Sequence, residues 1–175
     1  HFSVGLGIWL VTLGATPRRR EQLLDASVVA FASVAPDLDI PLGVVLGDPV
    51  GWHHGPTHSL VGAGLMGGGL ALLARSRAAK LAAVLGCLLH VPMDWSTGDA
   101  AEAARFGVPL FWPISETKYI SDPAIFGAFH INKEGFLLNL LAPEAVPVWG
   151  RELAFIAAVL VIVALLRRAR IARAA

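Results

Sequence analysis

Apolar stretches separated by short basic turns are the feature that most constrains this chain. Five such stretches can form helical segments, at 1–15, 22–35, 59–74, 81–97 and 148–166. A helix of about 20 residues crosses a bilayer core about 30 Å thick. Only 15% of the 175 residues are charged, against roughly 25% in soluble domains, and the mean hydropathy is +0.65. We therefore predict an all-α integral membrane bundle of about five spans, forming a single domain over residues 1–175.

The basic residues predict the orientation of this bundle. If the five segments are spans, three basic clusters fall on one side of the membrane, at Arg18–Arg20, Arg75–Lys80 and Arg167–Arg173. Loops rich in Lys and Arg stay on the cytoplasmic side. The opposite side, with residues 36–58 and a proline-rich loop cap at about 98–147, is therefore predicted to be extracytoplasmic. The net charge of +1 does not favour a nucleic-acid partner.

Residues 36–58 combine many ionisable groups with no cationic side chain. The stretch contains no Lys or Arg but holds Asp37, Asp39, Asp48, His53, His54 and His58. The preceding segment, 22–35, reaches only about 21 Å at 1.5 Å per residue, so the acidic motif is expected to begin inside the membrane boundary. Ionisable groups are costly there and mark functional sites. Carboxylates and imidazoles without a basic partner indicate that a metal ion is the missing cation.

A second pair of ligand-type residues lies further along the chain. His90 and Asp94 are four residues apart on a predicted helix, so they share one face. Pro92 between them is expected to kink or loosen that helix. Asp37 and Asp39 follow a helix end and would repel each other unless a cation or proton lay between them.

Together with His1, at the outer end of the first span, these groups converge on one membrane face. The predicted metal ligands are His1, Asp37, Asp39, His53, His58, His90 and Asp94. Seven ligands are too many for one tetrahedral zinc ion. Two or three Zn²⁺ ions are therefore predicted, with Mn²⁺ or another divalent metal as the alternative, and with Asp37 or Asp39 as the bridge. The single cysteine, Cys87, excludes a cysteine-based zinc site.

Other ionisable residues have simpler interpretations. Asp48 precedes a proline and is expected to form a plain turn within the apolar connector 40–52, which is predicted to be re-entrant or interfacial. Glu21 and Asp25, beside the preceding arginines, are expected to form an interfacial charge belt. His130 lies in the cap and is interpreted as a surface residue, with a substrate contact or a metal ligand as the alternatives.

Four motifs carry a family resemblance. They are Pro36-Asp37-Leu38-Asp39, His53-His54-Gly55-Pro56-Thr57-His58-Ser59, His90-x-x-x-Asp94 and Gly107-Val108-Pro109-Leu110-Phe111-Trp112-Pro113. Over roughly residues 1–115 the chain resembles the bacterial inner-membrane metal-dependent hydrolases of the YdjM type. The resemblance implies that the seven predicted ligands bind metal and that the protein is a multi-pass protein of the bacterial inner membrane. It also implies a distant likeness to zinc-dependent phospholipases C and fungal single-strand nucleases, which use three zinc ions.

The chain departs from that family's pattern at two places. His54 stands where the family has an arginine, which removes a phosphate-binding guanidinium or adds a ligand. The stretch between Asp94 and Gly107 is longer than the family's, so the cap is expected to be remodelled for a particular substrate.

These patterns predict a membrane-bound hydrolase in which metal-activated water attacks a phosphoester or pyrophosphate. A site at the outer interface favours a lipid or lipid-like substrate over a soluble one. Neither Gly-x-Ser-x-Gly nor His-Glu-x-x-His occurs, so a serine hydrolase and a zincin protease are disfavoured. The predicted catalytic residues are Asp37, Asp39 and His54. The predicted substrate-binding residues are His54, Lys118 and His130.

Two non-catalytic alternatives stay open at this stage. The same residues could form a metal-binding or transport site, although no internal repeat of the kind common in transporters is visible. They could also hold a metal ion that only stabilises the fold. The sequence predicts no oligomeric state.

Overall fold

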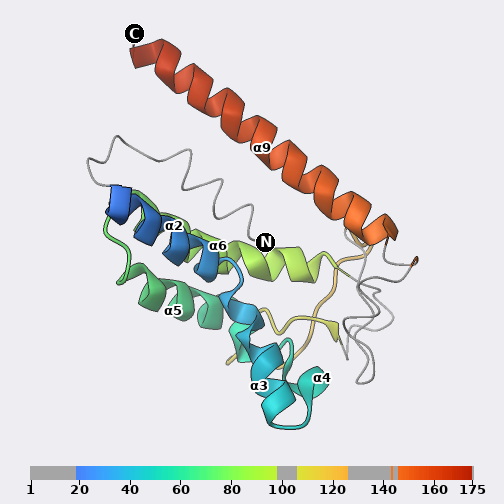
Figure 1. Ribbon diagram of the computed structural model, residues 1–175. Coiled ribbons are helices and arrows are strands. Elements are labelled where there is room, and N and C mark those ends of the chain that lie inside the picture. Colours follow the sequence, from blue (N-terminus) through green and yellow to red (C-terminus); the bar gives the residue numbers. More distant parts are fainter. Residues whose placement is uncertain (1–18, 98–105, 126–142, 144–145, 175) are drawn as a thin grey trace.

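The computed structural model describes residues 19–97, 106–125, 143 and 146–174, and apart from isolated bridges all regular structure in them is helical. The elements are α2 (Arg19–Ala32), η1 (Ala35–Leu38), α3 (Asp39–Val45), α4 (Pro49–Trp52), η2 (Pro56–His58), α5 (Leu60–Ala71), α6 (Arg77–Trp95) and α9 (Val146–Ala174). The predicted all-α class is thus confirmed for the described part of the chain (Figure 1).

Two of these helices are long and apolar enough to cross a membrane. They are α6 and the Val146–Leu166 part of α9, and a third span results if α2 and the arm Ala35–Val45, bent by 66°, count as one. The prediction of about five spans is therefore not confirmed. The expected span 1–15 lies outside the described residues. The expected span 59–74 is the helix α5, whose 12 residues reach only about 18 Å.

Small side chains let α5 and α6 approach each other closely. The buried residues of α5 are Ala63, Gly67 and Ala71, which recur every four residues on one face. A Cβ atom added at Gly67 would lie 2.9 Å from the Cα of Val84 in α6, so no larger residue fits. In membranes, where no hydrophobic effect drives helices together, such close backbone packing supplies much of the attraction. The core of the α2–α5–α6 group consists mainly of alanine and valine.

Proline 36 explains where α2 ends. A proline has no N–H group, so Pro36 cannot donate to the carbonyl of Ala32, and the Cys87 thiol of α6 donates to that carbonyl instead (2.9 Å). The Asp37 N–H turns to the carbonyl of Val34 (3.1 Å), which starts the tighter helix η1. The expected helix end at Pro36 is thus present, with the last α-helical residue at Ala32. The break leaves backbone carbonyls free for other donors.

Asp25 corrects the expected interfacial charge belt. Its side chain is buried, and its two carboxylate oxygens accept hydrogen bonds from the backbone N–H groups of Arg75 (2.7 Å) and Ser76 (3.1 Å). These groups lie in the turn between α5 and α6, just before α6 begins. Asp25 therefore ties α2 to that turn, a contact between residues 50 positions apart in the chain that no local pattern announces.

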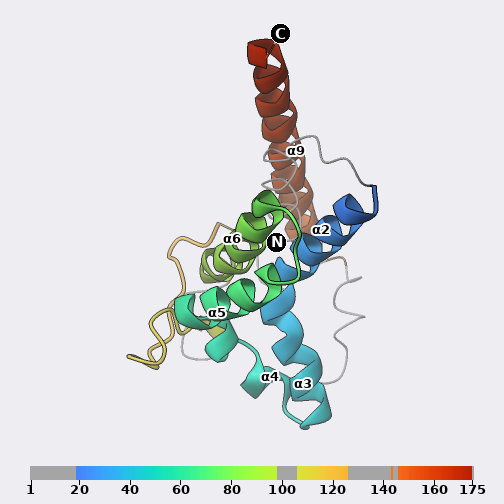
Figure 2. The same cartoon turned by 90° about the vertical axis from the view of Figure 1, so that its left-hand side faces the viewer.

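The connector 40–52 forms the short helices α3 and α4, joined by a turn in which Gly47 has a positive φ of 82°. These helices extend away from the α2–α5–α6 group in both views of the ribbon (Figures 1 and 2). Helix α9 lies apart from the same group, and only 6% of its apolar window is buried.

The described part of the predicted cap, residues 106–125, lies against the ends of two helices. Its backbone is joined to Trp95 and Ser96 at the end of α6 by hydrogen bonds from Ser121 (2.7 Å) and Ile125 (2.9 Å). At the start of α5, the Leu60 N–H donates to Leu110 (3.2 Å). The cap segment therefore covers the end of the bundle at which the His and Asp residues meet.

Candidate metal centre

Four donor atoms from three separate elements meet at the break between α2 and α3. Asp37 comes from η1, His58 ends η2, and His90 and Asp94 lie one turn apart on α6. The Nε2 of His58 is 3.1 Å from Asp94 Oδ2 and 3.5 Å from Asp37 Oδ1. The Nε2 of His90 is 3.0 Å from Asp94 Oδ2 and 3.2 Å from Asp37 Oδ1. All four ligand atoms lie within 4.8 Å of one another.

The spacing of this four-donor group fits a metal ion. Zinc binds nitrogen and oxygen ligands at about 2.0–2.2 Å, which places neighbouring ligands of a tetrahedral ion about 3.3–3.5 Å apart. The four distances above run from 3.0 to 3.5 Å. Two imidazoles and two carboxylates are also a common donor set for zinc and other divalent transition metals. The residues present could therefore hold one ion with little rearrangement.

The helix break orients His90. The backbone carbonyl of Ser33, in the turn after α2, accepts a hydrogen bond from His90 Nδ1 (2.9 Å). In a continuous helix this carbonyl would accept from the Asp37 N–H, which bonds to Val34 instead. Because Nδ1 donates to this carbonyl, Nε2, which faces the other donors, is the atom of His90 that can offer a lone pair to a metal ion. The break at Pro36 thus sets the tautomer of a candidate ligand.

Asp39 orients His58 and a second histidine. Its Oδ2 lies 3.0 Å from Nδ1 of His58 and accepts the Thr57 hydroxyl at 2.9 Å, while its Oδ1 lies 3.0 Å from Nδ1 of His53. Both carboxylate oxygens are therefore occupied by the Thr57 hydroxyl and by the Nδ1 atoms of His58 and His53, and not by the four donor atoms of the group. A carboxylate that accepts from Nδ1 of a ligating histidine fixes its tautomer and raises its basicity. The sequence assigned Asp39 as a ligand or bridge, and the structure places it behind two histidines.

The carboxylates around His58 favour a positive charge at this position. Its side chain is fully buried. Burial alone would lower its pKa, but the adjacent carboxylates of Asp37, Asp39 and Asp94 raise the pKa of His58 to about 11. The imidazole therefore holds a proton at neutral pH, and a divalent ion would replace that proton when it binds.

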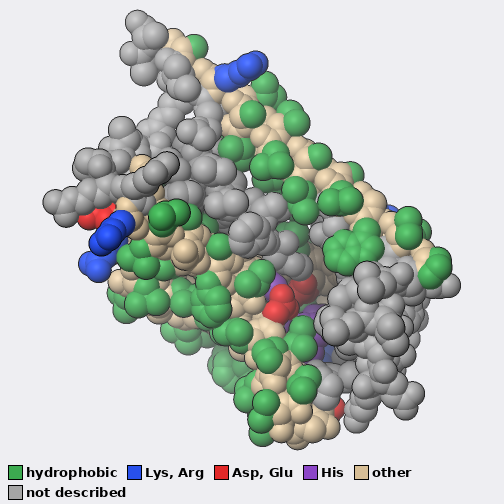
Figure 3. Space-filling model, viewed as in Figure 1, with side chains coloured by type: hydrophobic (Ala, Val, Ile, Leu, Met, Phe, Trp, Pro, Cys, Tyr) green, Lys and Arg blue, Asp and Glu red, His purple; other side chains and the backbone are tan. Residues whose placement is uncertain are grey.

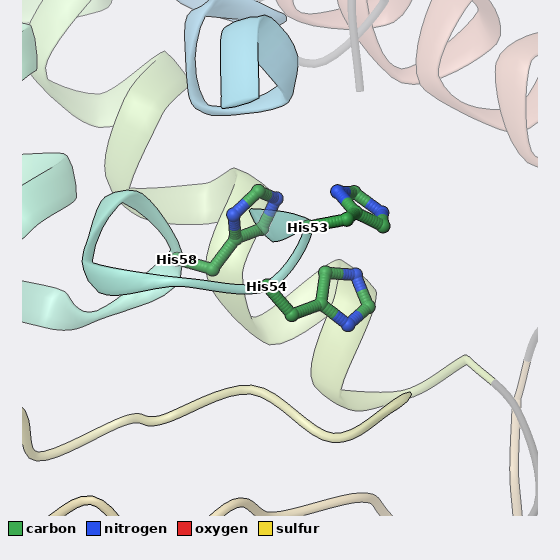
Figure 4. Close-up of side chains that lie close together, drawn as sticks. All are labelled: His53, His54 and His58. Carbon is green, nitrogen blue, oxygen red and sulfur yellow. The ribbon is translucent and has the colours of Figure 1, made fainter. Parts of the chain in front are cut away.

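His53, His54 and His58 form a second group of candidate ligands (Figure 4). The three rings follow one another along a short loop, with centroids 4.0 to 5.1 Å apart. His54 has a positive φ of 56°, which is uncommon for a residue other than glycine. Its Nδ1 is hydrogen bonded to the carbonyl of Phe106 in the cap segment, and its Nε2 lies 3.9 Å from Asp94 Oδ2.

His54 is a neutral imidazole in this environment. Burial and the neighbouring His53 and His58 lower its pKa to about 3. Because Nδ1 donates to Phe106, the Nε2 lone pair faces Asp94 and the four-donor group. His54 is thus an additional candidate ligand or proton acceptor, and not a cation.

The four-donor group is open on one side. The side chains of His58 and His90 are fully buried and that of Asp94 is 11% exposed, but the side chain of Asp37 is 35% exposed. The space-filling view shows acidic and histidine side chains in a hollow that hydrophobic side chains border on one side (Figure 3). Lys118, which is half-buried, has its pKa lowered by burial, with the nearby Asp39 carboxylate opposing that change. A cationic side chain therefore interacts electrostatically with Asp39, the carboxylate behind His58.

Several predicted site residues can be placed and others cannot. Asp37, His58, His90 and Asp94 come together as one group, and His53 and His54 border it. Asp48 is exposed and its Oδ1 accepts from the Gly51 N–H (3.0 Å), so the expected turn is confirmed. His1 and His130 lie outside the described residues. Pro92 does not end the helix, because α6 is helical from Arg77 to Trp95.

Sequence reasoning missed three supporting groups. They are the Thr57 hydroxyl, the Ser33 carbonyl and the Phe106 carbonyl. Two are backbone atoms, and a residue letter says nothing about where a carbonyl points. The only available signal was Pro36, because a proline frees the carbonyls of the preceding helical turn.

The helical fold and this group of donors define an all-helical membrane protein with a candidate metal centre at a broken helix. The sequence profile of the YdjM inner membrane protein family matches residues 1–174, and the chain belongs to that family. The match extends beyond the motifs at residues 1–115. No curated protein and no solved structure matches the chain.

Proposed function

We propose that this protein is a metal-dependent hydrolase that acts on a phosphoester or pyrophosphate of a lipid or lipid-like substrate. One observation carries the proposal: the donor atoms of Asp37, His58, His90 and Asp94 are spaced as the ligands of a single divalent ion would be. When bound, such an ion supplies Lewis acidity, which polarises a phosphoryl oxygen and activates water.

Hydrolysis requires room for water and substrate beside the ion. Four protein ligands fill a tetrahedral zinc ion, whereas catalytic ions keep a position open. An ion that accepts five or six ligands, as zinc in an expanded shell or Mn²⁺ can, leaves such a position. The exposed side of Asp37 is the open side of the group, so substrate approach from this direction agrees with the burial of the other three ligands.

The neighbouring residues support this assignment. The Nε2 lone pair of His54 lies beside Asp94 and could accept the proton of the attacking water. Lys118, close to Asp39, could bind the phosphoryl group of the substrate. His53 and His54 could also help to hold a second ion, as the number of predicted ligands suggests.

Metal content is the measurement that tests the proposal. The detergent-purified protein, prepared without chelators, is expected to contain at least one equivalent of zinc or another divalent metal. The double variant His58→Ala/His90→Ala is expected to lose it. Asp48→Asn, which changes an exposed carboxylate outside the group, is the matched control and should retain the metal. Wild-type protein without a divalent metal above background would overturn the proposal.

A turnover screen follows for protein that contains the metal. Phospholipids and prenyl pyrophosphates should release phosphate or a phosphorylated headgroup, and His54→Ala should slow release while leaving the metal content unchanged. Loss of metal in His54→Ala would instead identify His54 as a ligand.

The helix break also favours a second candidate, a metal-transport protein. Transporters place their sites at broken helices, and Asp37 lies at the 66° bend between Arg20–Ala32 and Ala35–Val45. Uptake of zinc into protein-containing vesicles, without turnover of any phosphate ester, would support transport in place of hydrolysis.

A further inference from the structure

The surface of α3 and α4 is more apolar than a water-facing connector would be. On α3 and the turn after it, Val44 is 62% exposed, Val45 82% and Leu46 53%. Leu42 and Trp52 are also exposed. The whole stretch from residue 36 to residue 58 contains no Lys or Arg. Adjoining exposed apolar side chains of this kind mark a surface that another apolar phase covers.

The direction of this arm relative to α2 limits how it can meet a membrane. Helix α2 packs against α6, which is long and apolar enough to cross. The arm Ala35–Val45 is bent by 66° from α2. The seven residues of α3 are about 10 Å long and, at that angle, advance only about 4 Å along the direction of α2. With α2 along the membrane normal, the arm would run more along the membrane plane than across it.

The apolar surface of the arm continues that of the helices beside it. Phe31 and Val34, at the end of α2, and Leu60, at the start of α5, are exposed large hydrophobic residues on either side of it. In an inner membrane protein these surfaces face lipid. The polar end of the arm is its beginning, where Asp37 enters the four-donor group. One end of the arm thus carries the candidate metal centre and the rest carries exposed aliphatic side chains.

We propose that α3 and α4 lie in the interface of one leaflet, with the exposed side chains of Leu42, Val45, Leu46 and Trp52 in the acyl boundary of the bilayer. An apolar element that lies in the interface is buried about 5–10 Å below the headgroup boundary. The arm then holds the candidate metal centre at headgroup level. The position of the metal centre at headgroup level rests on the proposed function. From that position we infer that the substrate is an amphiphile with an anionic headgroup.

Depth-dependent quenching tests the proposal on the full chain in vesicles of phosphatidylethanolamine and phosphatidylglycerol. In a Cys87→Ser background, which keeps a donor for the Ala32 carbonyl, a fluorescent thiol label is attached at Val45→Cys. Ala157→Cys, exposed in the apolar window of α9, is the deep control, and Glu116→Cys, exposed in the cap segment, is the aqueous control. Nitroxide lipids quench labels in the bilayer, and iodide quenches labels in water.

The label at Val45 is expected to be quenched most by nitroxides near the headgroup, at about 5–10 Å below the boundary, and little by iodide. A depth equal to that of Ala157 would show that the arm crosses the membrane and would overturn the proposal. So would iodide quenching like that of Glu116, or protection from both quenchers, which would show that protein covers the arm. Metal content measured on the same preparations distinguishes a failure here from a failure of the metal centre.

Discussion

Replacing Asp39 with asparagine separates the two roles that sequence and structure give this residue. Its two oxygens accept from Nδ1 of His53 and Nδ1 of His58, each at 3.0 Å. Asparagine offers only one oxygen, so its amide NH₂ must face one of the two Nδ1–H groups. Two donors cannot bond, and that histidine must move its proton to Nε2. If the histidine is His58, the atom that faces the four-donor group can no longer bind metal.

The expected loss is that of an orienting residue and not of a ligand. Removal of the carboxylate behind a metal-binding histidine weakens metal affinity about 10- to 100-fold, or about 1.4–2.7 kcal/mol. Thr57→Val removes one hydrogen bond to the same carboxylate (2.9 Å) but leaves both oxygens in place, so its loss should be smaller than that of Asp39→Asn. Asp37→Asn changes a ligand atom and should have the largest effect of the three.

Competition with a chromogenic chelator, on metal-free protein in one detergent, measures these affinities. Far-UV circular dichroism checks that each variant keeps its helices. If Asp39→Asn weakens binding as much as Asp37→Asn, Asp39 is itself a ligand and the sequence prediction of direct ligation was the better one. An affinity within about twofold of wild type would refute the orienting role.

Three further predictions concern packing and pH. Gly67→Ala should destabilise the protein by about 1–3 kcal/mol in thermal unfolding in detergent, because the added Cβ would lie 2.9 Å from the backbone of α6. Gly68→Ala is the control, because its added Cβ would have nothing within 4 Å, and it should be neutral or stabilising. Asp25→Asn should cost about 1.5–3 kcal/mol, because a charged acceptor of two backbone N–H groups is lost, and an unchanged melting temperature relative to an exposed-site control, Glu116→Gln, would contradict this. Metal binding at neutral pH should release a proton, since the raised pKa of His58, about 11, keeps it protonated. Affinity should then fall roughly tenfold or more for each unit by which the pH is lowered, because His90 Nε2 faces two of the same carboxylates and can release a second proton. Titration calorimetry in buffers of different ionisation enthalpy would reveal no proton release if this is wrong.

Much of the candidate site was predictable because it depends on local spacing. His90 and Asp94 had to share a face of any helix that contained them, and α6 brings both into the four-donor group. Asp37 and His58 were predicted because ionisable groups in an apolar chain without cations need a partner. The apolar segments predicted α2, α5 and α6 to within about four residues at each end, whereas α9 continues beyond the predicted end at 166 to Ala174.

The number of membrane spans was less predictable. Apolar composition indicates that a segment is buried, but it does not indicate whether lipid or protein covers the segment. Residues 59–74 are apolar enough for lipid, yet α5 is only 12 residues long and packs its small residues on α6. Asp25 was misread for a related reason. A carboxylate near arginines in the sequence resembles a charge belt, but its partners are backbone N–H groups 50 residues away.

The sequence by itself determined the class of protein and the chemistry available to it. Apolar composition indicates a membrane, Pro36 favours a helix end, and the supply of imidazoles and carboxylates without basic partners favours a cation. The tertiary structure decided which carboxylate faces the other candidate ligands and which one orients the histidines. Asp37 and Asp39 are two residues apart in one motif, but only Asp37 reaches the donors of α6, while Asp39 lies behind His53 and His58. Ligand and orienting residue differ in their distance from atoms on other helices, and that distance is set only when α2, α6 and the 53–58 loop pack together.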